Sequence, residues 1–133
     1  MANRLYDLGR ESFLKGEISW NGDNIKAVLV DSASYTPNTA TDQFLSSVSG
    51  ITATSGNLTS PTTADGVAGA ANVTYPSVTG NQSEYIVIYQ DTGVAGTSRL
   101  IALVDTATGL PVTPNGGDIT VEWDAGANKI FKL

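Results

Sequence analysis

The chain has 133 residues and a mass of 13.8 kDa, a length typical of one domain. It contains no cysteine and no histidine, which excludes disulfides, thiolate chemistry, imidazole metal sites and any mechanism that needs a histidine base. Thirteen acidic against seven basic residues give a formal net charge of −6, which disfavours nucleic acid as a partner. Six of the seven bases lie near the two ends of the chain, namely Arg4, Arg10, Lys15, Lys26, Lys129 and Lys132. This asymmetry favours termini that bind an acidic surface, the alternative being bases placed wherever the fold tolerates them.

Residues 1–16 predict a short N-terminal helical arm. Asn3 can cap a helix that runs to Lys15, and Gly16 can end it. Gly9 weakens its middle, and its apolar positions are Leu5, Leu8 and Phe13. Charged residues interrupt this segment, and no stretch of the chain approaches 18 apolar residues. We therefore expect no signal peptide, no membrane span and synthesis in a cytoplasm.

The next residues predict a β-hairpin. Ile18 and Trp20 alternate with polar neighbours, Asn21-Gly22 offers a tight turn, and residues 25–30 are apolar on both faces apart from Lys26. Two such strands around a two-residue turn are typical of hairpin pairing.

Residues 31–72 are dominated by Ser, Thr, Ala, Gly and Asn. Within them, residues 42–48 predict one helical turn, capped by Asp42. The stretch is too long for an ordinary loop in a compact domain. It either forms an extended segment, disordered or lying along a neighbouring subunit, or it forms several short irregular strands on the same domain.

Residues 73–133 predict the main strand region, with strands at 73–78, 85–90, 100–104, 119–123 and 129–131. The runs 85–89 and 100–104 are apolar on both faces, which indicates central strands covered on two sides. In residues 119–123 one face is apolar and the other polar, as in a half-exposed strand. Together these patterns predict a single, mainly β domain, a β-sandwich or jelly roll of about seven or eight strands with a short N-terminal helix. The core candidates are Val28, Val30, Ile86, Ile88, Ile101, Leu103, Val121 and Trp123.

Three patterns bear on chemistry. Asp91-Thr92-Gly93 matches the triplet of aspartic proteases, but it lies between two predicted central strands, where a hairpin turn is expected. Residues 115–118 and 124–128 offer oxygen ligands for calcium without the spacing of a dedicated loop. Trp20 and Trp123 could stack on sugars, yet each lies on the apolar face of a predicted strand. We therefore expect no catalytic residues, no metal and no cofactors, and keep a calcium-assisted, glycan-binding β-sandwich module as an alternative.

The two ends of the chain carry a family resemblance. Residues 1–7 with Gly9-Arg10-Glu11, Phe13-Leu14, Gly16, Ile18, Trp20 and 25–31, and the closing residues 105–133, resemble a family of small tailed-bacteriophage virion proteins. The chain is most similar to head decoration, or cement, proteins, and its Ser/Thr-rich middle matches poorly.

The resemblance implies a protein of the virion exterior that binds the major capsid protein as a homotrimer, is assembled in the bacterial cytoplasm and is not an enzyme. It implies no nucleic acid and no membrane as partner. The residues expected to contact the capsid are Arg4, Leu5, Leu8, Arg10, Phe13 and Lys15. The related alternative is a structural subunit of the phage tail or baseplate.

Overall fold

The computed structural model describes residues 4–105, 110–123 and 130–132. Over these residues the chain is mainly β, as predicted, with ten strands, one α-helix and one 3₁₀ helix. In chain order the elements are β1 (Arg4–Leu5), α1 (Asp7–Leu14), β2 (Ile25–Val30), η1 (Leu45–Ser47), β3 (Ile51–Thr54), β4 (Thr62–Ala64), β5 (Val67–Gly69), β6 (Val73–Tyr75), β7 (Tyr85–Gln90), β8 (Leu100–Val104), β9 (Ile119–Val121) and β10 (Phe131–Lys132).

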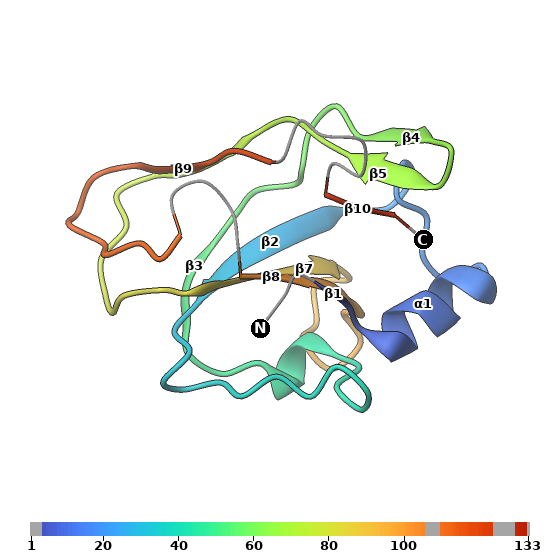
Figure 1. Ribbon diagram of the computed structural model, residues 1–133, viewed down its shortest axis with the longest axis horizontal. Coiled ribbons are helices and arrows are strands. Elements are labelled where there is room, and N and C mark those ends of the chain that lie inside the picture. The colour runs from blue at the N-terminus through green and yellow to red at the C-terminus, as the bar shows by residue number, and fades with distance from the viewer. Residues whose placement is uncertain (1–3, 106–109, 124–129, 133) are drawn as a thin grey trace.

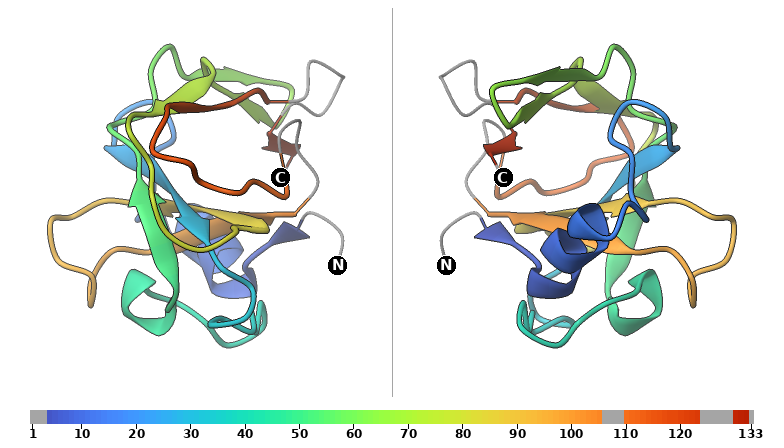
Figure 2. Two further views of the ribbon diagram at one scale, coloured as in Figure 1. Left: turned by 90° about the vertical axis from the view of Figure 1, so that its left-hand side faces the viewer. Right: turned by 90° about the vertical axis from the view of Figure 1, so that its right-hand side faces the viewer.

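The strands form three antiparallel sheets in a sandwich-like arrangement. A five-stranded sheet of order β1-β8-β7-β2-β3 crosses the middle of the molecule. Two small sheets, β10-β5-β4 and β6-β9, cover one of its faces (Figure 1). The loop that contains η1 and the start of α1 cover the other face, and β1 and β10 lie on the same side of the molecule (Figure 2).

The three central strands are buried on both faces, which confirms the prediction for 85–89 and 100–104. In β7, Ile86 and Ile88 pack toward the small sheets, while Val87 packs toward the η1 loop. All three side chains are fully buried. Because β7 pairs with β2 on one side and β8 on the other, its six residues make no edge to solvent. Two apolar clusters, one on each face of a single sheet, therefore form the core.

The core candidates lie mostly where burial was expected. Their exposed fractions are between 0 and 2%, except for Trp123, which is half-buried; the others are Val28, Val30, Ile86, Ile88, Ile101, Leu103 and Val121. Trp123 donates its indole N–H to the Ala71 carbonyl (3.0 Å), and Trp20 donates to Gly69 (3.0 Å). These bonds satisfy the polar atom of each large ring and attach it to the layer of small sheets.

The predicted hairpin at residues 18–30 is wrong. The chain forms β2 as expected, but β2 pairs with β7 and β3 rather than with the residues before it. Ile18 and Trp20 are buried without belonging to a strand. The turn that follows is closed locally, because the backbone N–H of Ser19 donates to the Asp23 carboxylate (2.7 Å).

The Ser/Thr-rich stretch 31–72 folds onto the same domain, as the second alternative for it expected. It supplies β3, which pairs with β2, and β5, which pairs with β10. The predicted helical turn is the 3₁₀ helix η1, but Asp42 does not cap it. The Asp42 carboxylate instead accepts hydrogen bonds from the Tyr35 hydroxyl (2.7 Å) and the Asn38 N–H (3.0 Å).

The N-terminal helix is shorter than predicted. It begins at Asp7, because Arg4 and Leu5 are paired with β8 as strand β1. It ends at Leu14, one residue before the predicted Lys15, and Gly16 follows with a φ of 75°, a conformation that residues with a Cβ rarely adopt. The proposed cap Asn3 lies outside the described residues.

Candidate interaction surface

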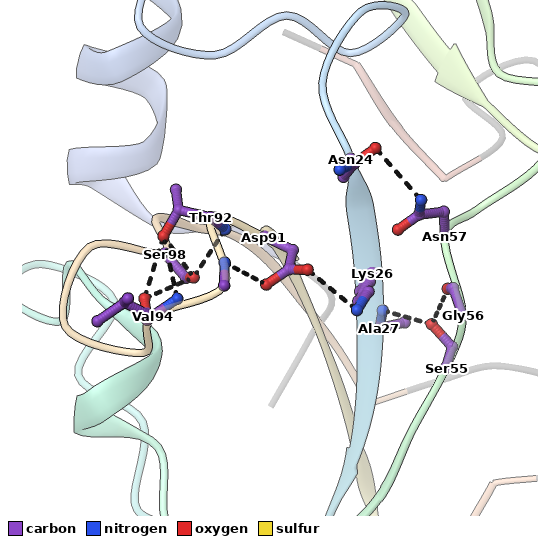
Figure 3. Close-up of polar contacts among 11 residues, drawn as sticks. Asn24, Lys26, Ala27, Ser55, Gly56, Asn57, Asp91, Thr92, Val94 and Ser98 are labelled. Atoms are coloured by element: carbon purple, nitrogen blue, oxygen red, sulfur yellow. Dashed lines mark hydrogen bonds and ion pairs between the residues drawn. The ribbon is translucent and has the colours of Figure 1, made fainter.

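Asp91 occupies a hairpin turn, as the sequence predicted. Its carboxylate lies 3.0 Å from the Lys26 ammonium and accepts the Gly93 N–H (3.0 Å) (Figure 3). Gly93 has a φ of 86°. The hydrogen bond from Lys26, with a smaller contribution from Gly93, lowers the pKa of Asp91 below its ordinary value. All of these contacts favour an ionised carboxylate that closes the turn between β7 and β8.

The residues that the sequence suggested for calcium or glycan binding also close turns or pack in the core. Asp118 accepts the Ser77 N–H (3.0 Å), and the Asn115 side chain accepts the Gly117 N–H (3.0 Å). Among the described residues, no three His, Cys, Asp or Glu side chains are grouped to hold a metal ion. The second calcium candidate, 124–128, lies outside those residues. Trp20 is only 6% exposed, so it does not present the open ring face that a glycan-binding module would need.

The N-terminal arm is part of the domain. Leu5 is 4% exposed and belongs to the core cluster, so in this fold it cannot fill a recess on a partner. Tyr6 is fully buried, and its backbone N–H donates to the Ile101 carbonyl (3.0 Å). Leu8 and Phe13 are half-buried. The expectation that Leu5 anchors a separate arm to a partner is therefore corrected, because β1 pairing takes this side chain into the core.

The bases of α1 are paired with acids of the same helix. Arg10 lies 3.8 Å from Asp7, and Lys15 lies 2.8 Å from Glu11. All four groups are exposed. The two bases balance two acids, so the exposed helix face has no net formal charge. The predicted attraction of Arg10 and Lys15 to carboxylates of a partner must therefore compete with these existing pairs.

Arg4 and Lys132 are the bases nearest the two ends in the described chain. Both side chains are exposed, on the edge strands β1 and β10. Neither forms an ion pair with another described residue. Figure 2 places both strands on the same side of the molecule. Among the described residues, this side of the molecule, here called the terminal edge, therefore carries two basic side chains without an ion-pair partner.

Aromatic residues from the two ends of the sequence meet beside α1. The ring of Phe131 lies edge-on to Trp20, with centroids 5.2 Å apart and planes at 86°, and 6.2 Å from the ring of Phe13. Next to them is an open apolar recess of about 220 Å³, lined by Phe13, Trp20, Thr63, Gly66, Val67, Ala68 and Phe131. Leu14, which follows Phe13 at the end of α1, is 88% exposed.

The sequence analysis predicted neither this recess nor the exposure of Leu14. The recess depends on contacts between residues more than one hundred positions apart, which no local pattern indicates. Leu14 carried a usable signal, since on a helix it lies four residues from Arg10 and three from Glu11 and therefore on the charged face.

A scan against protein-family models matches no family. A search of curated proteins also finds no significant match. No helix in the described part of the chain is long and apolar enough to cross a membrane.

Proposed function

We propose that the chain is a bacteriophage head decoration protein, which binds the outside of the major capsid protein shell as a homotrimer and stabilises the head. One observation carries the proposal: the two terminal segments that resemble such proteins pack against each other in the fold. Phe131, from the C-terminal segment, lies against Phe13 and Trp20 of the N-terminal segment. Two separate stretches of resemblance thus meet in the fold.

The basic side chains on the terminal edge suit an acidic partner. The molecule carries a formal charge of −6, yet Arg4 and Lys132 on the terminal edge lack a partner among the described residues. A shell surface rich in carboxylates would attract this edge and repel the acidic remainder, which fixes the orientation of docking. Leu8 of α1 is only half-buried, so part of its side chain remains open to apolar contact.

Cosedimentation with tailed-phage heads that lack their own decoration protein tests the proposal, followed by electron microscopy of the pelleted particles. We expect saturable binding at regular positions on the shell. The double substitution Arg4→Glu, Lys132→Glu should weaken binding by roughly tenfold at low salt, since each exposed ion pair contributes at most about 1 kcal/mol.

The matched control is Lys26→Glu. It also reverses a basic charge, but Lys26 already pairs with Asp91 inside the fold. Its effect on head binding should be small once its folding has been checked by circular dichroism. Wild-type protein that stays in the supernatant with every head tested, or binds without any ordered position on the shell, would overturn the proposed function.

A further inference from the structure

An exposed apolar side chain, Leu14, directly follows a residue that lines an open apolar recess. Leu14 is 88% exposed, the most exposed large apolar side chain among the described residues. The recess begins at its neighbour Phe13 and has apolar walls from Val67, Ala68 and Phe131. A single exposed leucine is ordinary on a protein surface, but a leucine beside an unfilled apolar recess can lose water only by meeting another molecule.

The charges around Leu14 favour a second copy of the chain as that other molecule. Most surfaces of a chain with thirteen acids and seven bases repel an identical surface. The exposed face of α1 does not, because Asp7 and Glu11 are balanced by Arg10 and Lys15. The residues next in sequence to the recess lining also include both signs, since Lys132 follows Phe131 and Asp65 precedes Gly66.

Because the surface around Leu14 carries both acids and bases, ion pairs can form between copies. The Lys15 and Glu11 side chains are both about half exposed. A face that carries both an exposed acid and an exposed base can meet a second copy without like charges facing each other at every position. Such a polar rim around an apolar centre is the usual anatomy of a protein interface.

We infer that Leu14 of one copy enters the apolar recess of a second copy. The inference rests on the self-association included in the proposed function and assigns it to a surface. In a trimer, three such contacts close a ring, because each copy offers one Leu14 side chain and one recess.

Cysteine pairs test the contact directly, because the chain has no native cysteine. Leu14→Cys protein is mixed with Thr63→Cys protein, Thr63 being an exposed residue of the recess, and the mixture is oxidised mildly. A chain with one cysteine cannot form an internal disulfide. We expect a 14–63 disulfide between copies, identified by mass spectrometry of the peptides, since a disulfide needs Cα atoms within about 7 Å.

The matched control is Val94→Cys mixed with the same Thr63→Cys protein. Val94 is 61% exposed but lies in the β7–β8 loop, away from the recess. We expect little 94–63 disulfide. Equal yields from both mixtures, or only 14–14 disulfides, would overturn the inference.

Sedimentation of single substitutions gives a second measurement. Leu14→Glu should weaken self-association by about tenfold or more, because it places a charge in the recess, while Val94→Glu should leave it unchanged. Circular dichroism should show both variants folded, since both side chains are exposed. An oligomer that persists in Leu14→Glu overturns the inference but not the function, which head binding tests separately. A wild-type chain that remains monomeric at all concentrations overturns the inference and the trimer, while head binding by that monomer would preserve the shell-binding role.

Discussion

Gly9 lies at the closest approach between α1 and the central sheet. A Cβ at this position would lie 2.4 Å from the Leu100 carbonyl oxygen and 3.2 Å from the Ile101 Cα. The opposing atoms are backbone, which cannot turn aside as a side chain can. The glycine that weakens the helix by its propensity is therefore what lets the helix pack on β8.

Gly9→Ala should destabilise the fold. Alanine favours a helix by about 1 kcal/mol over glycine, but overpacking against backbone costs about 1–3 kcal/mol, so we expect a net loss of up to about 2 kcal/mol. Urea unfolding measures the change. Gly96→Ala is the control, because an added Cβ there meets nothing within 4 Å. A Gly9→Ala variant more stable than wild type would show that α1 can move away from β8.

Asp91 provides a prediction about pH. Asp91→Asn preserves a side-chain acceptor for the Gly93 N–H but removes the charge paired with Lys26. For a partly exposed pair of this kind we expect a loss of about 0.5–1 kcal/mol at neutral pH.

The sign of the pH dependence follows from the lowered pKa of Asp91. The folded state holds the carboxylate ionised more strongly than the unfolded state does, so its contribution is present above an unfolded pKa of about 4 and is lost as the pH falls through the folded pKa. The stability difference between wild type and Asp91→Asn should therefore shrink on acidification. Urea unfolding at a series of pH values checks this, and a difference that grew toward low pH would contradict the pairing.

At the scale of elements, β1 and α1 close the edge of the five-stranded sheet. Deleting residues 1–15 would remove the buried Leu5 and Tyr6 and leave β8 unpaired on one side. Each buried apolar side chain contributes about 2–3 kcal/mol, so the loss approaches the whole stability of an ordinary domain. We expect the truncated chain to show no cooperative melt by circular dichroism.

The control for this truncation is Leu14→Ser. Leu14 belongs to the same helix but is exposed, so its replacement should change stability by less than about 0.5 kcal/mol. A truncated chain that melted cooperatively near the wild-type temperature would show that the arm is separable after all, as a detachable capsid-binding arm requires.

The elements that the sequence predicted well are those whose signal is local and strong. In β7 and β8 continuous apolar runs are bounded by a turn at Asp91-Thr92-Gly93, and the structure has both strands at the predicted bounds. The three-residue strands β4 and β5 carry no periodicity, and besides each other β5 pairs with β10, which contains Phe131 at the other end of the chain. The hairpin prediction failed for the same reason, since long-range pairing of β2 with β7 outweighed the local Asn21-Gly22 turn.

At the scale of the whole molecule, folding neutralises much of the charge asymmetry of the sequence. Besides the pairs within α1, Lys26 pairs with Asp91 and Arg99 lies 3.3 Å from Glu17. Among the described bases, Arg4 and Lys132 are therefore the ones that form no ion pair with another described residue. The remaining surface is acidic and keeps separate copies apart at long range.

This balance predicts how salt affects self-association. Copies that meet through Leu14 and the recess bring apolar surface together against a net repulsion between chains of charge −6. Raising the salt from about 0.05 M to about 0.5 M shortens the Debye length from about 14 Å to about 4 Å, which screens the repulsion and leaves the apolar contact intact. Sedimentation velocity should therefore show association strengthening as salt rises, and Leu14→Glu should stay dissociated across the range. An oligomer that dissociated as salt increased would instead be held by ion pairs, and the contact would then have to be sought among the exposed charges of α1 and the terminal edge.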